Sequence, residues 1–279
     1  PDGDENNTFF WQERLMIHLP FSGIKGQDLN KEVIVKVPCM EMYSKKCPIL
    51  SEIREWFKDK DLENDAKKYW KKYSYLYQGF VVKDTIPEEH PPENPVRRFI
   101  INRNIHNIIK ESLMDTDMEN LPIEYENGRD FKIKKTKNGQ YANYSTSTWS
   151  QKERALTKEE KKAIDEYGLF DLREFLPNEP SEKGLEIIKQ MFEASYQGEP
   201  YYPEKWSEYY RPPGVQNLND TSDDSSKNES LSKLRSKVND KNDSGNEDEN
   251  VSDVETEDDS DKKQNPKDIL DKIKQRQNK

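Results

Sequence analysis

The N-terminal half of the chain alternates between hydrophobic and polar positions in the way that β-strands do. Val33, Val35 and Val37 fall on one face of a strand predicted at residues 32–37. The same pattern predicts further strands at residues 15–19, 73–83 and 96–101. We therefore expect a β-rich domain within residues 1–150.

Two stretches of this domain have helical spacing instead. Residues 51–72 are highly charged and place Ile53, Trp56 and Phe57 on one inner face of a predicted helix. A second helical face is predicted from four apolar residues, Ile105, Ile108, Ile109 and Leu113. The domain is thus predicted to be of the α+β class, with helices inserted between strands.

The dipeptide Asn138-Gly139 favours the tight turn of a β-hairpin, because both residues adopt positive φ readily. The predicted arms of this hairpin are residues 131–135 and 140–145. It would carry Lys132, Lys134, Lys135 and Lys137 near the turn, followed by Tyr141 and Tyr144.

A helical region is predicted at residues 151–214, where it would pack on the β-rich core. Thr157 and Glu160 form a capping box that begins a helix ending near Tyr167. Two further segments are expected, a helix at residues 181–194 and an extended, aromatic segment at residues 196–213.

Charge is distributed very unevenly along the 279 residues. The formal net charge is −10, and residues 240–261 alone contain eleven acidic residues and one lysine. We expect residues 215–279 to form a disordered acidic tail, with a short amphipathic helix at residues 268–274. The remainder is close to neutral, so local basic patches on it can still bind nucleic acid.

Three basic and aromatic patches indicate a nucleic-acid ligand. The first, residues 67–77, holds four lysines and five aromatic residues, the mixture that contacts phosphates and stacks on unpaired bases. The hairpin is the second patch, and Arg97 and Arg98 beside Phe99 make the third. The alternative for each patch is an aromatic core strand with solvated lysines. The candidate DNA-binding residues of the first patch are Lys67, Lys68, Lys71, Lys72, Tyr73 and Tyr75.

Metal, redox and catalytic signals are sparse. His18, Cys39 and Cys47 are three candidate zinc ligands, but Leu50 stands where a closing cysteine would complete the usual four. A small apolar packing cluster is the alternative. No phosphate-binding glycine loop or nucleophile motif occurs, and no signal peptide or apolar run of membrane length is present. A reducing cytosol is therefore expected, which favours thiols over a disulfide.

Four short motifs, in order and spacing, resemble the single-stranded DNA-binding, helix-destabilising protein family of T-even-type bacteriophages. The resemblance covers about residues 10–150, and an acidic C-terminal tail agrees with it. The motifs are Cys47-Pro48-Ile49-Leu50, Phe80-Val81-Val82-Lys83-Asp84, Pro92-Glu93-Asn94 leading to Arg98 and Phe99, and Tyr141-Ala142-Asn143-Tyr144.

The resemblance implies an OB-fold-like barrel core with a positively charged cleft and a zinc subdomain, here degenerate, at about residues 10–72. By position, it implies DNA-facing rings at Tyr43, Tyr75, Phe99, Tyr141 and Tyr144, to which the first basic patch adds Tyr73. His18, Cys39 and Cys47 match three of the family's four zinc ligands. The family's basic N-terminal arm, which links neighbouring proteins on DNA, has no counterpart in this sequence. Self-association along DNA is therefore left open.

These observations predict a non-enzymatic, sequence-tolerant single-stranded DNA-binding protein. Its expected roles are phage DNA replication, recombination and repair in the cytoplasm of an infected bacterial host. Expected partners are single-stranded DNA and, through the acidic tail, phage replication and recombination proteins. A metal-dependent nuclease and an RNA-binding or protein-interaction module are the alternatives.

Overall fold

The computed structural model describes residues 10–27, 31–85, 88, 91–115, 117, 119–139 and 141–215. The predicted acidic tail beyond Val215, with its amphipathic helix, lies outside the described residues, as does the side chain of Tyr141. The contacts divide the chain into two compact units. Unit 1 contains residues 10–15 and 73–178, and unit 2 contains residues 16–72 and 179–215.

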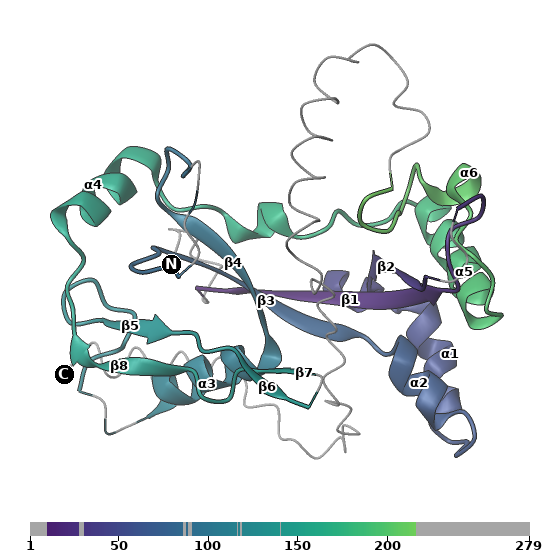
Figure 1. Ribbon diagram of the computed structural model, residues 1–279, viewed down its shortest axis with the longest axis horizontal. Helices are drawn as coiled ribbons and strands as arrows, with labels where there is room; N and C mark the ends of the chain where they lie inside the picture. The colour runs from purple at the N-terminus through teal and green to yellow at the C-terminus, as the bar shows by residue number, and fades with distance from the viewer. Residues whose placement is uncertain are drawn as a thin grey trace, which may run out of the picture. The chain divides into compact units, whose positions relative to one another are not determined.

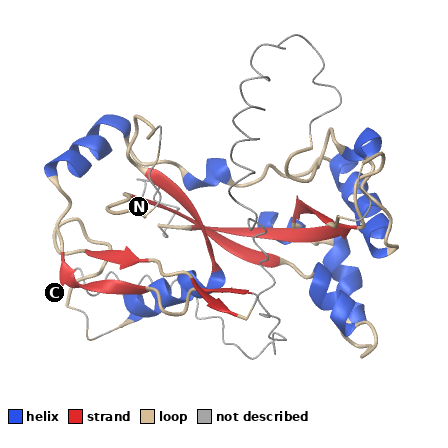
Figure 2. Cartoon of the chain, in the orientation of Figure 1, coloured by secondary structure: helices blue, strands red, loops and turns tan. Residues whose placement is uncertain are grey.

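Strands and helices follow one another in groups along the described residues (Figures 1 and 2). The strands are β1 (Gln12–Phe21), β2 (Val33–Pro38), β3 (Lys72–Gly79), β4 (Arg97–Asn102), β5 (Arg129–Lys132), β6 (Thr136–Asn138), β7 (Tyr141–Asn143) and β8 (Thr148–Glu153). The helices are α1 (Pro48–Trp56), α2 (Glu63–Tyr69), α3 (Arg103–Met114), α4 (Lys158–Tyr167), α5 (Glu182–Tyr196) and α6 (Pro203–Trp206), with 3-10 turns η1 (Met40–Tyr43) and η2 (Leu172–Phe175).

The four longer strands predicted at the N-terminal half are confirmed and form one sheet in the order β2-β1-β3-β4. β1 pairs antiparallel with β2, and β3 pairs antiparallel with β4. Val35 and Val37 of β2 are fully buried, whereas Lys36 between them is exposed, as the alternation predicts. The protein is therefore of the α+β class, with a curled antiparallel sheet that is compatible with an OB-like core.

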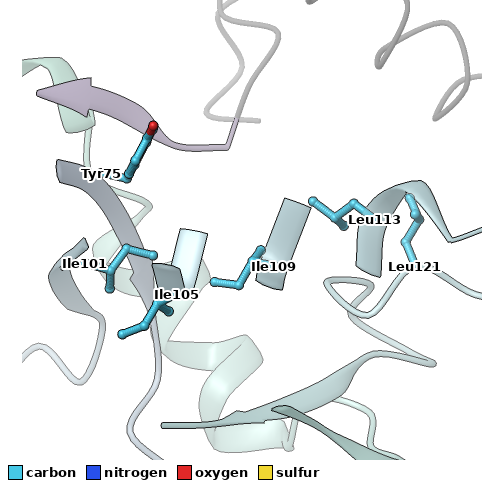
Figure 3. Packing of buried hydrophobic residues seen from close by; sticks show 6 residues of the cluster. All are labelled: Tyr75, Ile101, Ile105, Ile109, Leu113 and Leu121. Atoms are coloured by element: carbon cyan, nitrogen blue, oxygen red, sulfur yellow. The ribbon is translucent and has the colours of Figure 1, made fainter. Parts of the chain in front are cut away.

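In unit 1, one face of α3 builds the core (Figure 3). Ile105, Ile109 and Leu113 succeed one another at helical spacing, and all three are buried. Asn102 begins the helix, because its side chain accepts a hydrogen bond from the backbone N–H of Ile105 at 3.0 Å. Ile101 of β4 and the ring of Tyr75 complete this part of the cluster.

The prediction of one helix at residues 51–72 is wrong, because the structure contains two helices, α1 and α2, separated by a turn at residues 57–62. The Asp59 carboxylate accepts a hydrogen bond from the backbone N–H of Asp61 at 3.0 Å. Such a bond from side chain to nearby backbone competes with the helical hydrogen bonds and favours a turn.

The hairpin with its turn at Asn138-Gly139 is confirmed, but the range predicted for its first arm, residues 131–135, is wrong. The hairpin consists of β6 and β7, with Asn138 opposite Tyr141 and Gly139 at a φ of 62°. Phe131 belongs instead to β5, which pairs with the unpredicted strand β8, where Phe131 lies opposite Trp149. Their rings pack edge to face with centroids 5.0 Å apart, a contact between residues far apart in sequence.

The C-terminal predictions are largely confirmed. Thr157 caps α4 as a capping box, with the backbone N–H of Glu160 donating to Thr157 at 3.2 Å and the backbone N–H of Thr157 donating to the Glu160 carboxylate at 2.8 Å. The predicted helix at residues 181–194 is α5. The prediction of an extended segment at residues 196–213 is wrong for much of its length, because this segment contains the end of α5, the short helix α6 and turns at residues 197–198 and 207–209. The predicted domain boundaries stay predictions.

Candidate nucleic-acid interface

The aromatic face of unit 1 begins with the two-residue repeat of β3. Tyr73, Tyr75 and Tyr77 occupy alternate positions, so their side chains leave the strand on the same side. Across the ladder Tyr77 lies opposite Phe99, and Tyr75 lies opposite Ile101. The strand register thus collects rings from two strands over one hydrophobic cluster.

His106 organises the centre of these rings. The Tyr75 ring stacks on the imidazole with centroids 3.5 Å apart and planes only 5° apart, and the Tyr77 hydroxyl lies 2.9 Å from Nδ1. Burial, assisted by the nearby charges of Lys110 and Arg103, lowers the pKa of His106 to about 4. The imidazole is therefore neutral at neutral pH, and Nδ1 can accept the hydrogen bond that the Tyr77 hydroxyl donates.

Around this centre, several rings are only partly buried and so keep accessible edges or faces. They are Phe10, Trp11, Tyr73, Tyr77, Phe99, Phe131, Tyr144 and Trp149, and all pack against the same cluster. The Trp11 and Tyr77 rings lie nearly parallel, 14° apart, and the Arg103 guanidinium lies 5.5 Å from the centre of the Tyr73 ring. Half-buried rings held on a rigid core suit base stacking, because their orientation is set before a base arrives.

The second component of the interface is the basic hairpin region. Lys132, Lys134, Lys135 and Lys137 are all exposed, and none forms an ion pair with a residue that the structure describes. The backbone N–H of Lys134 donates to the Ser147 hydroxyl at 3.0 Å, which ties the segment to the loop before β8. Within the described part of the chain, these four ammonium groups have no carboxylate partner and are available to bind phosphates.

Tyr144, which the sequence placed among the DNA-facing rings, lies just after β7 and is half-buried against the unit 1 cluster. Tyr141 lies on β7. Tyr73 and Phe99 are also half-buried on this cluster, so the structure brings these predicted positions together in unit 1. Tyr75 differs, because only 6% of it is exposed and its face is covered by His106. Its role as a DNA contact stays a prediction.

The two predicted arginines have other partners in unit 1. Arg97 forms an ion pair with Glu88 at 3.0 Å and donates to the backbone oxygen of Asn94 at 2.7 Å. The exposed Arg98 lays its guanidinium over the Phe175 ring, 3.7 Å from the centroid, with Phe170 at 4.7 Å. Both side chains therefore have local structural contacts in addition to any they make with DNA.

The lysines before β3 are mostly engaged within unit 2. Lys67 pairs with Glu63 at 2.5 Å along α2, and Lys71 pairs with Glu41 at 3.1 Å. The side chain of Lys71 is only 11% exposed. Lys68 is exposed and lies 5.8 Å from the Tyr69 ring centre, and Lys72, at the start of β3, is half-buried.

Tyr43 is the remaining predicted ring and lies in η1 of unit 2. It is half-buried, and burial, together with nearby Tyr210 and Glu179, raises its pKa to about 12. Its hydroxyl therefore stays neutral. Whether this ring contacts DNA stays a prediction.

The candidate zinc ligands do not assemble into a four-ligand site. Among the described residues, no group of three or more His, Cys, Asp or Glu side chains could hold a metal ion. Cys39 and Cys47 are buried free thiols that hydrogen-bond to each other, an interaction that lowers the pKa of Cys47, with backbone amides contributing. Leu50, where a ligand would be required, is fully buried and offers no donor atom. The residues present do not fit a structural zinc site.

Several rings of the interface were not predicted as site residues. Tyr77 continues the alternation of Tyr73 and Tyr75, so the two-residue period alone indicates it. Trp11 and Trp149 carry no such signal, because β8 was not predicted and because Trp11 reaches Tyr77 only through the fold. No nearby residue in the sequence indicates a role for His106, because its contacts with Tyr75 and Tyr77 come from β3.

The exposed lysines and the half-buried rings of unit 1 together are typical of the surface of a nucleic-acid-binding protein. A family model described as gp32 DNA binding protein like matches residues 4–195, more than half of the chain. The chain therefore belongs to the gp32-like family, the single-stranded DNA-binding family of T-even-type bacteriophages that its motifs resemble. No curated protein matches the chain significantly. No helix among the described residues is long and apolar enough to cross a bilayer.

Proposed function

We propose that the protein binds single-stranded DNA without strong sequence preference and protects melted strand during phage DNA replication, recombination and repair. The observation that carries this proposal is the combination, within unit 1, of four exposed lysines that form no ion pair with a described residue and a set of half-buried rings on one core cluster. The family to which the chain belongs supports DNA as the ligand.

Phosphate binding and base stacking have separate roles in this proposal. Lysines of the hairpin region release counterions from the DNA backbone, so affinity falls steeply as salt rises. Tyr73, Phe99, Tyr144 and, by position, Tyr141 stack on bases, each contact contributing about 1–3 kcal/mol. A duplex keeps its base faces paired and stacked, so the same rings favour melted strand. Tyr75 and Lys71 support the fold in this arrangement, because both are nearly buried.

The acidic segment after Val215 has a regulatory role in the proposal. Its carboxylates compete with phosphates for the basic surface when little DNA is bound, and on displacement they recruit replication and recombination proteins in the host cytoplasm. Removing the residues after Val215 should therefore tighten DNA binding and help duplex melting. An unchanged affinity after this removal would refute the competition.

Fluorescence titration of the full chain with an unlabelled single-stranded oligonucleotide tests the proposal. Strong quenching by single strand, weak quenching by the matched duplex and a loss of both at higher salt are expected. No response at low salt, even without the acidic tail, would mean that the rings serve only as core. Recovery of intact oligonucleotide after incubation with Mg²⁺ or Mn²⁺ separates binding from nuclease activity, and an RNA oligonucleotide of the same sequence measures the preference for DNA.

A further inference from the structure

In unit 2, the family resemblance implies a metal at the chain segment between β2 and α1. The fourth ligand of that metal is missing, because Leu50 offers no donor atom. Cys39 and Cys47 bracket this loop, and both are buried free thiols. Leu50 and Ile53 of α1 are fully buried there, and Ile49 is 2% exposed. The interior of the loop is thus two thiols against aliphatic side chains, which is a packed apolar core and not a ligand set.

A structural metal does more than fill space, because its ligands tie several chain segments to one point. In unit 2 the carboxylate of Glu41 has this geometry. One oxygen of Glu41, on η1, accepts from the Arg54 guanidinium of α1 at 2.5 Å. The other oxygen accepts from the Lys71 ammonium, between α2 and β3, at 3.1 Å. A single side chain therefore joins the loop, α1 and the start of β3.

The surroundings make this junction stronger than an ordinary surface ion pair. The Glu41 side chain is 23% exposed and that of Lys71 only 11%, so solvent screens their attraction poorly. The centre of the Trp70 ring lies 5.8 Å from the Arg54 guanidinium carbon and 5.8 Å from the Lys71 ammonium nitrogen. Phe57 packs edge to face on Trp70. Glu41 and Lys71 are thus partly desolvated, whereas the Arg54 side chain is 47% exposed and its attraction to Glu41 is screened more.

We propose that Glu41, paired with both Arg54 and Lys71, replaces a structural metal as the cross-link of this loop, so that unit 2 folds and stays closed without zinc. The thiols of Cys39 and Cys47, together with Leu50, complete the replacement by filling the interior. This proposal does not depend on the proposed DNA-binding function, since it concerns the stability of unit 2.

The first experiment measures metal dependence directly. The full chain is unfolded, freed of metal with a strong chelator, refolded in zinc-free buffer and compared with untreated protein for zinc content, melting temperature and tryptophan fluorescence. We expect well under one zinc per chain, the same melting temperature and no response to added zinc. About one zinc per chain, together with a melting temperature that falls on chelation and recovers on addition of zinc, would overturn the proposal.

The second experiment tests the cross-link itself. Lys45 and Lys46 lie in the loop, so trypsin cleavage after them reports its opening. Glu41→Gln should raise the cleavage rate about tenfold, because Arg54 and Lys71 both lose the carboxylate that they share. Glu52→Gln is the matched control, since Glu52 is exposed on α1 and forms no ion pair with a described residue.

Chelator should leave the cleavage rate of the unchanged chain as it is. If Glu41→Gln does not fold, Arg54→Gln provides the test, because it removes only one of the two pairs and leaves Glu41 bound to Lys71. Equal cleavage rates in Glu41→Gln, or in this substitute, and in Glu52→Gln would overturn the cross-link. Faster cleavage of the unchanged chain on chelation would overturn the metal independence.

Discussion

Two stretches of this chain each contain four lysines together with aromatic residues, but their lysines have different surroundings. Residues 67–77 and residues 132–144 both mix lysines with aromatic rings. In the first stretch, Lys67 and Lys71 form ion pairs, and Tyr69 and Tyr75 are buried. In the second, the lysines are exposed without an ion pair among the described residues, and Tyr144 is half-buried.

The difference shows that a count of lysines does not measure the positive charge available to DNA. The partner of Lys71 is Glu41, thirty positions earlier in the chain. A lysine already paired with a carboxylate must give up that interaction before it binds a phosphate, so its net contribution to affinity is small. The lysines at positions 132–137 form no ion pair with a described residue, so no such interaction is lost when they bind a phosphate.

The largest expected effect is on the folding of unit 1. Tyr75→Ala should lower its stability by about 3–5 kcal/mol, because a buried ring stacked on His106 leaves a cavity. Denaturant unfolding followed by tryptophan fluorescence measures this loss. A variant that keeps its stability but loses DNA affinity would show instead that Tyr75 stacks on bases, and would erase the contrast between the two stretches.

Next in size is the contribution of Tyr144 to DNA affinity. Tyr144→Ala should weaken single-strand binding by about 2 kcal/mol, or roughly 30-fold, since one stacked base loses its platform. Tyr144→Phe is the control and should bind nearly as well, because stacking uses the ring and not the hydroxyl. Fluorescence titration at constant salt provides both values, and equal affinity of the Ala and Phe variants would remove Tyr144 from the interface.

The neutral His106 at the centre of the rings predicts a pH dependence of stability. Its pKa is about 4 in the fold and about 6.5 in an unfolded chain, so between these values the unfolded state binds more protons. Its contribution is complete above about pH 6.5 and is lost as pH falls toward 4, reaching a loss of about 2 kcal/mol between about pH 7 and pH 5. Denaturant titrations at the two pH values measure it.

The control for this prediction is His106→Gln, which stays neutral at both pH values. It should be less stable than the unchanged chain at pH 7 because it loses the stacked imidazole. Its stability should nevertheless fall less on acidification, and an identical fall in both proteins would mean that His106 does not titrate in this range.

The smallest expected effect compares the two stretches lysine for lysine. Lys132→Gln with Lys134→Gln should weaken single-strand binding about tenfold at low salt and reduce the salt slope by roughly 1–1.5, the value for two phosphate contacts. Lys67→Gln alone should change affinity much less than Lys132→Gln alone, because Lys67 is already paired with Glu63. Equal losses in these two single variants would show that ion pairing does not decide which lysines bind DNA.

Local patterns were sufficient for most of the elements. The valine alternation of β2, the apolar face of α3, the Asn138-Gly139 turn and the Thr157 capping box depend on neighbours within a few positions, and all are confirmed. The break between α1 and α2 was missed because Asp59 ends the helical hydrogen bonds where the charge pattern continues. Strand β8 was missed because its contact with Phe131 of β5 comes from strand pairing and leaves no local pattern in residues 148–153.

The candidate site was only partly predictable for the same reason. Phe99 and Tyr144 were named from motifs and Tyr73 from the first basic patch, and the structure gathers all three on one cluster. Trp11 and Trp149 were not named, because their neighbours on that cluster are distant in the chain. The sequence showed that Leu50 stands where a fourth zinc ligand would be required, but it did not show the two ion pairs of Glu41.

The sequence by itself therefore determined the strands and helices that follow short periods, the basic hairpin with its turn, the family and the missing fourth zinc ligand. Tertiary structure alone decided which rings are buried, which lysines are neutralised and what holds the loop between Cys39 and Cys47. Periodicity and turn chemistry are properties of adjacent residues, whereas burial and ion pairing depend on which distant segments the fold brings within a few ångströms.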